Sequence, residues 1–340
     1  MLRPSAPCTV MFKWLKPRRR EAPSGASAPP ATDRGIGHGS AEALLARVAW
    51  ASARRLDGLL QGNYRTLFRG SGLMLADLRE YGPQDDVRHI DWNVTARMQT
   101  PHVRQHEEDR ELAAWFVVDL SPSMDFGSGD TTKRDIAAQT VATLGQLLLQ
   151  HGNRIGAIVD RGRPSPDIFP ARSGRRHLLR VLRHLLTAPC EPTEQMTSLG
   201  VLLARSARLI KQRSTVFVLS DFYSASGWDK ALGQLASRHD VVAVRLVDPI
   251  EQNLPDIGML TMRDTETGEQ VFVDTSDRTF RQRFMARAES HEAALLEAFG
   301  RCAVDCVELS TADAVHEGLM RFVRQRQQLM RLAAGGVRHA

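Results

Sequence analysis

The chain has 340 residues, of which 42% are hydrophobic and 25% charged, so it is long enough to bury a sizeable core, and a wholly disordered or fibrous protein is excluded. The formal net charge of +6 comes from the two ends, since residues 1–40 hold seven Lys and Arg against two acids and residues 318–340 hold five Arg and no acid. The body between them holds 33 basic and 37 acidic residues, which argues against nucleic acid as a partner.

Hydropathy and cysteine usage indicate a cytoplasmic protein. No apolar run approaches the ~20 residues that a membrane-spanning helix needs. The short run Val10–Leu15 is interrupted by Lys13 and followed by three arginines, so it is not a convincing signal peptide, although such a basic leader could touch an anionic membrane surface weakly. The four cysteines show no paired spacing, which predicts reduced thiols. Whether Met1 or Met11 is the true start stays open.

The first predicted helix follows a leader that has too little apolar material to fold. Residues 1–39 are rich in Pro, Ser, Gly and Ala, and we expect them to be a disordered basic leader. Ser40 is a suitable cap for a helix with apolar residues at three- and four-residue spacing up to Leu60. This helix would open an added N-terminal lobe over residues 40–110.

The second half of this lobe gathers titratable side chains. The densest group consists of Asp85, Asp86, His89 and Asp91. Pairing of these acids with neighbouring arginines in an irregular segment is the favoured interpretation, and a catalytic or second metal site is the alternative. His102 and His106 have a spacing that could suit zinc, but no third ligand is evident, so an exposed edge strand over Pro101–Gln105 is favoured.

The centre of the chain combines a buried strand with an oxygen-rich turn. Val117 and Val118 stand side by side without polar alternation, which is typical of a strand buried on both faces of a parallel sheet. Asp119 falls at the carboxyl end of this strand, where ligands bind in open α/β sheets, and Ser121 and Ser123 follow. One carboxylate and two hydroxyls suit a hard cation such as Mg²⁺, although Asp and Ser are also ordinary turn residues after strands.

A second strand ends in the same way. The apolar run from Ser214 ends in Ser220 and Asp221. Ahead of it, a helix over 198–210 is preceded by Thr197 at a natural cap position, with Thr193 nearby as an alternative. The chain thus contains, in order, a strand with Asp, a Thr before a helix, and another strand with Asp. Helix capping and loop formation are the plain alternatives for the Thr and the second Asp.

The remaining pattern alternates helices with strands. Helices are expected over 133–151, 174–187, 228–238, 277–299 and 311–333, strands over 154–159, 241–247 and 303–309, and hairpins over 164–170 and 257–274. This alternation predicts an α/β fold with a doubly wound, mostly parallel sheet flanked by helices. The main domain would span residues 111–325, followed by a basic tail over 326–340.

Several segments resemble known families. The Asp-x-Ser-x-Ser motif resembles the first motif of von Willebrand factor A domains. The runs Asp77–Tyr81, Gly82–Trp92, Thr95–Arg97 and Asp119–Met124 look like those that define domain-of-unknown-function family 58, whose core is similar to A domains. The resemblance implies a metal-ion-dependent adhesion site for Mg²⁺ or Mn²⁺ with the ligands Asp119, Ser121, Ser123, Thr197 and Asp221. An ion held there is short of negative ligands and binds an acidic side chain of a partner.

The resemblance also implies the kind of partner. Members of family 58 are encoded beside MoxR-type AAA+ ATPases and A-domain proteins, which implies a non-enzymatic role in protein assembly or maturation. A metal-assisted hydrolase or phosphotransferase is the alternative, but a phosphoaspartyl mechanism would want a carboxylate where Ser121 stands. No GxSxG, GxxxxGK[ST] or GxGxxG motif lies at a strand–helix turn. A structural scaffold with a vestigial metal motif is the third hypothesis.

Overall fold

The protein is built around a parallel sheet that positions the candidate site. The computed structural model describes residues 12–14, 41–51, 78–82, 87, 90, 92–104, 113–189, 198–264 and 270–335. Within these residues the largest sheet has six strands in the order β11-β8-β7-β4-β5-β6. Its strands are β4 (Ala113–Asp119), β5 (Arg154–Asp160), β6 (Asp167–Arg172), β7 (Thr215–Ser220), β8 (Asp240–Val247) and β11 (Asp305–Ser310).

The predicted doubly wound, mostly parallel sheet is confirmed. Strand β4 pairs in parallel with both β5 and β7, and β8 pairs in parallel with both β7 and β11. Only β6 runs antiparallel among these six strands of the described chain, and it carries Pro170 at the sheet edge, where a missing N–H is tolerated. A hairpin within residues 164–170 is expected from the sequence, but the structure has a single strand there, which forms a hairpin with β5. The order of strands reverses between β4 and β7, so the ends of these two strands flank the ligand-binding position of such sheets.

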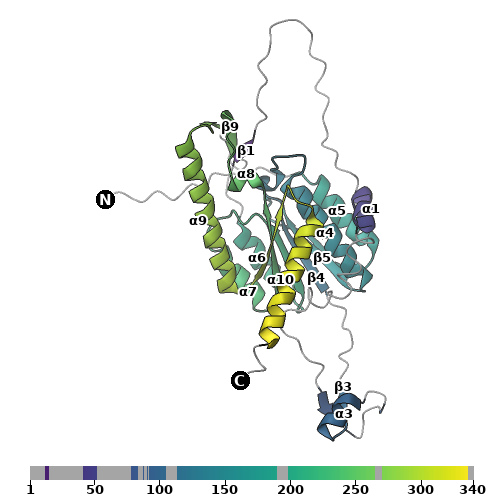
Figure 1. Ribbon diagram of the computed structural model, residues 1–340. Helices are drawn as coiled ribbons and strands as arrows, with labels where there is room; N and C mark the ends of the chain where they lie inside the picture. Colours follow the sequence, from purple (N-terminus) through teal and green to yellow (C-terminus); the bar gives the residue numbers. More distant parts are fainter. Residues whose placement is uncertain are drawn as a thin grey trace, which may run out of the picture.

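Helices cover both faces of the sheet (Figure 1). One face packs against α1 (Ala41–Ala51), α4 (Lys133–Gln150), α5 (Arg175–Thr187) and α10 (Val315–Gly335). The other face packs against α6 (Leu199–Leu209), α7 (Trp228–Ala236) and α9 (Arg278–Cys302). Val118 faces the first layer and Val117 the second, and both are fully buried. Val117 and Val118, two adjacent apolar residues, therefore belong to a strand that is covered on both faces, as the sequence predicts.

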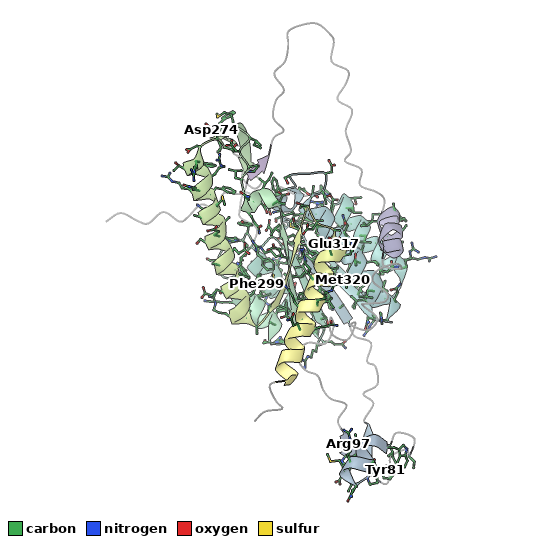
Figure 2. All side chains as sticks on the ribbon, in the orientation of Figure 1. Tyr81, Arg97, Asp274, Phe299, Glu317 and Met320 are labelled. Atoms are coloured by element: carbon green, nitrogen blue, oxygen red, sulfur yellow. The ribbon has the colours of Figure 1, made fainter. Side chains whose placement is uncertain are left out.

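Helix α1 belongs to the main domain. Its residues Ala41, Leu44 and Leu45 are buried in the same core as α4 and α5, and Glu42 pairs with Arg183 of α5 at 3.1 Å. The predicted boundary at residue 110 therefore separates this helix from the core to which it contributes. Elsewhere in the expected lobe, the described residues form β2 (Leu78–Glu80), α3 (Trp92–Met98) and β3 (His102–Arg104), and β2 pairs antiparallel with β3. Tyr81 and Arg97 mark this part of the chain in Figure 2.

The predicted hairpin near residues 257–274 forms and carries an additional strand. Strand β9 (Met259–Asp264) pairs antiparallel with β10 (Gln270–Asp274). On its other edge β9 pairs with β1 (Phe12–Trp14), which lies in the leader that the sequence predicts to be disordered. In Figure 2, Asp274 lies at the end of this hairpin, beside the start of α9.

No helix within the described ranges is long and apolar enough to cross a lipid bilayer. Cys302 and Cys306 are free thiols.

Candidate functional site

The carboxyl ends of β4 and β7 bring two predicted site residues to one edge of the sheet. Asp119 ends β4, Ser220 ends β7, and Asp221 follows. Ser220 Oγ donates to Asp119 Oδ2 at 2.8 Å, so a hydrogen bond joins the two strand ends. The backbone N–H of Ser121 donates to Asp119 Oδ1 at 2.9 Å. All four residues are buried, and the Asp119 side chain is fixed through both of its oxygens.

The two motif serines turn back toward each other. Pro122–Asp125 forms a single 3₁₀ turn, η3, in which the Met124 N–H donates to the Ser121 carbonyl at 2.9 Å. This turn brings Ser121 Oγ and Ser123 Oγ to 3.0 Å from one another. Both side chains are buried. A carboxylate and two hydroxyls therefore lie in this turn at the carboxyl end of β4.

Asp221 is already engaged by a cation from within the chain. Lys133 Nζ donates to Asp221 Oδ2 at 2.8 Å and to Glu251 Oε1 at 2.8 Å. The other oxygen of Asp221 accepts the Tyr223 N–H at 3.1 Å. Lys133 and Asp221 are completely buried, and only 13% of the Glu251 side chain is exposed. We call these three residues, Lys133, Asp221 and Glu251, the Lys133 bridge.

Local capping explains how Lys133 reaches the site. Lys133 is the first residue of α4, after the N-cap Thr132, whose side chain accepts from the Asp135 N–H while Asp135 caps Thr132 in return. The Lys133 N–H donates to the Phe126 carbonyl at 2.9 Å, and Nζ lies 5.8 Å from the centre of the Phe126 ring. These contacts tie the start of α4 to the turn that follows the motif.

Asp248 orders the loop that supplies Glu251. It is fully buried and caps the short helix α8 (Pro249–Gln252) through the Ile250 N–H at 3.0 Å. Its Oδ2 accepts from the Ser128 N–H at 2.8 Å and from the Thr311 hydroxyl at 2.6 Å. One carboxylate thus connects the loops that follow β4, β8 and β11, and the Asp248 N–H donates to Glu251 Oε2 at 3.1 Å, which helps to hold Glu251 in place.

Burial and charge shift the acid–base equilibria of the site. Burial, together with the charge of Asp221, raises the pKa of Asp119 from 3.8 to about 6, against the hydrogen bonds that favour its ionised form. Burial also raises the pKa of Glu251, although Lys133 opposes that shift. For Lys133, burial disfavours the charged form, but the carboxylates of Asp221 and Glu251 outweigh it and raise its pKa. Lys133 therefore stays protonated and acts as a permanent cation.

The donor set suits a hard cation only in part. Asp119, Ser121 and Ser123 offer oxygens of the kind that Mg²⁺ and Mn²⁺ prefer, so these three fit. Asp221 has the right chemistry, but the ammonium of Lys133 already neutralises it. Thr197 lies outside the described residues.

The sequence patterns did not indicate that Lys133, Glu251 and Ser220 take part in the site. For Lys133 a signal was available, because a lysine in the first turn of a helix is disfavoured by the helix dipole and needs compensating acids.

The other titratable groups of the sequence do not form a second site in the residues described. Asp85, Asp86, His89, Asp91 and His106 lie outside them. His102 lies on β3, and its Nδ1 is 2.7 Å from the carbonyl of Thr100. Across the described ranges, no group of three or more His, Cys, Asp or Glu side chains has metal-binding geometry. The candidate site at Asp119 differs from such a group, because two of its oxygen donors are the serine hydroxyls of Ser121 and Ser123.

Comparison with known proteins gives the family. The sequence model described as "Protein of unknown function DUF58" matches residues 77–294. The chain belongs to this family. The resemblance drawn from the motifs around Asp119 is thereby confirmed.

Two relatives of this chain are described as uncharacterised proteins. An uncharacterised protein of Mycobacterium tuberculosis is 35% identical over 301 residues, which cover 88% of this chain and 94% of the relative. The uncharacterised protein YeaD of Bacillus subtilis is 25% identical over 122 residues, which cover 36% of this chain and 28% of YeaD.

Solved structures of low similarity include von Willebrand factor A-like domains. An aerotolerance-related membrane protein of Bacteroides fragilis matches with a TM-score of 0.41 and 14% identity, covering 64% of this chain and 99% of that one. The von Willebrand factor A domain of SpRpn10 matches with a TM-score of 0.35 and 16% identity, covering 64% of this chain and 95% of that one. Because these TM-scores and identities are low, the fold is assigned from the strand order of the sheet itself.

Proposed function

We propose that this DUF58 protein is a non-enzymatic interaction module that binds an acidic side chain of a partner protein through a divalent cation at the carboxyl edge of its sheet. The observation that carries the proposal is the convergence of Asp119, Ser121 and Ser123 at the point where the strand order reverses. Thr197 and Asp221 are the further ligands that the resemblance to A domains implies.

The chemistry of these groups supports a metal-mediated contact. Mg²⁺ and Mn²⁺ prefer oxygen ligands, and one carboxylate with two hydroxyls leaves the ion short of negative charge. The bound ion would supply an open position for a carboxylate from outside. Within the chain, the Asp119 carboxylate would neutralise part of the ion's charge, while the hydroxyl of Ser220 and the N–H of Ser121 keep that carboxylate oriented.

The partner that we propose is a MoxR-type AAA+ ATPase or another A-domain protein, in the cytoplasm. Support for this partner comes from the resemblance to family 58. The free thiols of Cys302 and Cys306 are in keeping with a reducing compartment.

Capture from the native host tests this function. The tagged full-length chain should retain the AAA+ ATPase in Mg²⁺ and release it in EDTA, and Asp119→Asn should behave in Mg²⁺ as the wild type does in EDTA. Glu297→Gln is the matched control, since it also removes one carboxylate, but from a side chain on α9 that is 72% exposed. Capture that is equal in Mg²⁺ and EDTA, or unaffected by Asp119→Asn, would overturn the metal-mediated contact.

A further inference from the structure

The Lys133 bridge places a cation of the chain itself where the proposed metal site expects a free carboxylate. Lys133 Nζ lies 2.8 Å from Asp221 Oδ2, inside an environment that excludes water from both groups. The residues that form the bridge are far apart in sequence, since Asp221 is 88 positions and Glu251 is 118 positions after Lys133. The contact is therefore a product of the tertiary fold and not of helix spacing.

Charge balance gives the bridge a consequence for metal binding. The carboxylates of Asp221 and Glu251 contact one ammonium, and the charge of Asp221 also acts on Asp119. A divalent cation that is to gain Asp221 as a ligand must therefore displace or tolerate a buried ammonium in direct contact with that ligand, and repulsion between like charges in a dry environment is strong.

Glu251 gives the displaced ammonium a place to remain. It accepts from Lys133 at the same distance as Asp221 does, and it lies on α8, on the more exposed side of the bridge. If Lys133 leaves Asp221, it keeps one paired carboxylate. The exchange thus does not strand an unpaired buried charge, which would be prohibitive.

We infer that Lys133 is an internal counter-ion that competes with the divalent cation for Asp221 and so keeps the metal affinity of the site low until the bridge opens. This inference rests on the proposed metal site and adds its regulation. Asp221 is a latent ligand, neutralised by Lys133 in the closed bridge and released to the metal in the open one.

Two double variants with equal charge test the competition. Lys133→Met with Glu251→Gln removes the ammonium and keeps Asp221, whereas Lys133→Met with Asp221→Asn removes the ammonium and keeps Glu251. Each change deletes one cation and one carboxylate, so both variants have the net charge of the wild type, and neither leaves the bridge with an uncompensated pair of acids. Binding of Mn²⁺ to the full-length proteins is measured from the spin resonance signal of the free ion.

The variant that keeps Asp221 should bind Mn²⁺ at least tenfold more tightly than the wild type, and the variant that keeps Glu251 should not. Adding Asp119→Asn to the first variant should abolish the gain, which places the ion at this edge. Equal affinity of the wild type and the Asp221-retaining variant, an equal gain in both variants, or a gain that survives Asp119→Asn would overturn the inference.

A measurement on the wild type does not depend on any variant folding. Saturating Mn²⁺ should raise the rate at which an amine-specific reagent labels Lys133, read by mass spectrometry relative to the exposed Lys230. An unchanged Lys133 rate would overturn the competition. If the inference fails while partner capture still needs Mg²⁺, the proposed function stands. If partner capture ignores Mg²⁺ while the variants differ as expected, the proposed function fails and the counter-ion remains.

Discussion

Replacing Lys133 by methionine should destabilise the metal-free protein strongly. The side chains of Lys133 and Asp221 are completely buried, and that of Glu251 is 13% exposed. Removal of the ammonium leaves two carboxylates without the cation that each contacts at 2.8 Å. Breaking a buried ion pair by deleting one partner costs roughly 3–5 kcal/mol. We expect Lys133→Met to lie at the upper end of this range, because one deletion leaves two acids unpaired.

A double-mutant cycle separates this cost from lost packing. Lys133→Met combined with Asp221→Asn should be more stable than Lys133→Met alone, since the second change removes one of the stranded charges. Coupling between residues in one ion-pair network is about 0.5–3 kcal/mol. Urea unfolding in EDTA at pH 7.5, followed by circular dichroism, gives each free energy of unfolding.

An exposed ion pair provides the reference for this cycle. Arg301→Met removes the cation that contacts Glu297 at 2.7 Å on the surface of α9, and the expected cost is below about 1 kcal/mol. The reasoning is refuted if Lys133→Met costs no more than Arg301→Met. It is also refuted if adding Asp221→Asn fails to recover any stability.

Three further predictions concern the turn after β4, the titration of Asp119 and the buried His239. Gly127→Ala would place a methyl group 2.2 Å from the carbonyl oxygen of Thr131. Because this oxygen belongs to the main chain and cannot move aside by a rotamer change, we expect the free energy of unfolding to fall by roughly 3 kcal/mol. Gly129→Ala is the control: the added methyl group meets no atom within 4 Å, so the free energy of unfolding in urea should change by less than about 0.5 kcal/mol. Because the pKa of Asp119 is raised from 3.8 to about 6, the folded state favours its protonated form and ionisation of Asp119 opposes folding. In EDTA, the stabilisation by protonated Asp119 is fully present below pH 3.8 and is lost as the pH rises through 6. Asp119→Asn should remove this fall from the plot of unfolding free energy against pH. Burial and neighbouring arginines lower the pKa of His239 below 6.5, so stability should fall as the pH drops below 6.5, and a His239→Leu profile as steep as the wild type's would contradict this assignment.

The strands of the main sheet could be predicted because their signal is local. Val117 and Val118 lack polar alternation, and the structure buries them in opposite layers. The same kind of reading failed for β1, since a three-residue strand is defined by its partner, and the partner β9 lies some 250 positions along the chain. The packing of α1 against α4 and α5 could not be predicted either, because the apolar face of α1 carries no information about which core it joins.

The sequence by itself determined which residue types end β4 and β7, and therefore that Asp119, Ser121, Ser123 and Asp221 meet at one edge of a doubly wound sheet. Strand polarity and the period of burial are properties of short segments, so they can be read before any tertiary contact is known. Only the tertiary structure decided that Ser220 orients Asp119 and that Lys133 and Glu251 engage Asp221. A long side chain can reach many neighbours, and the neighbour that it contacts depends on how separate loops pack at the edge of the sheet. Because a buried charge without a partner is costly, only a packing that pairs each charged group is stable.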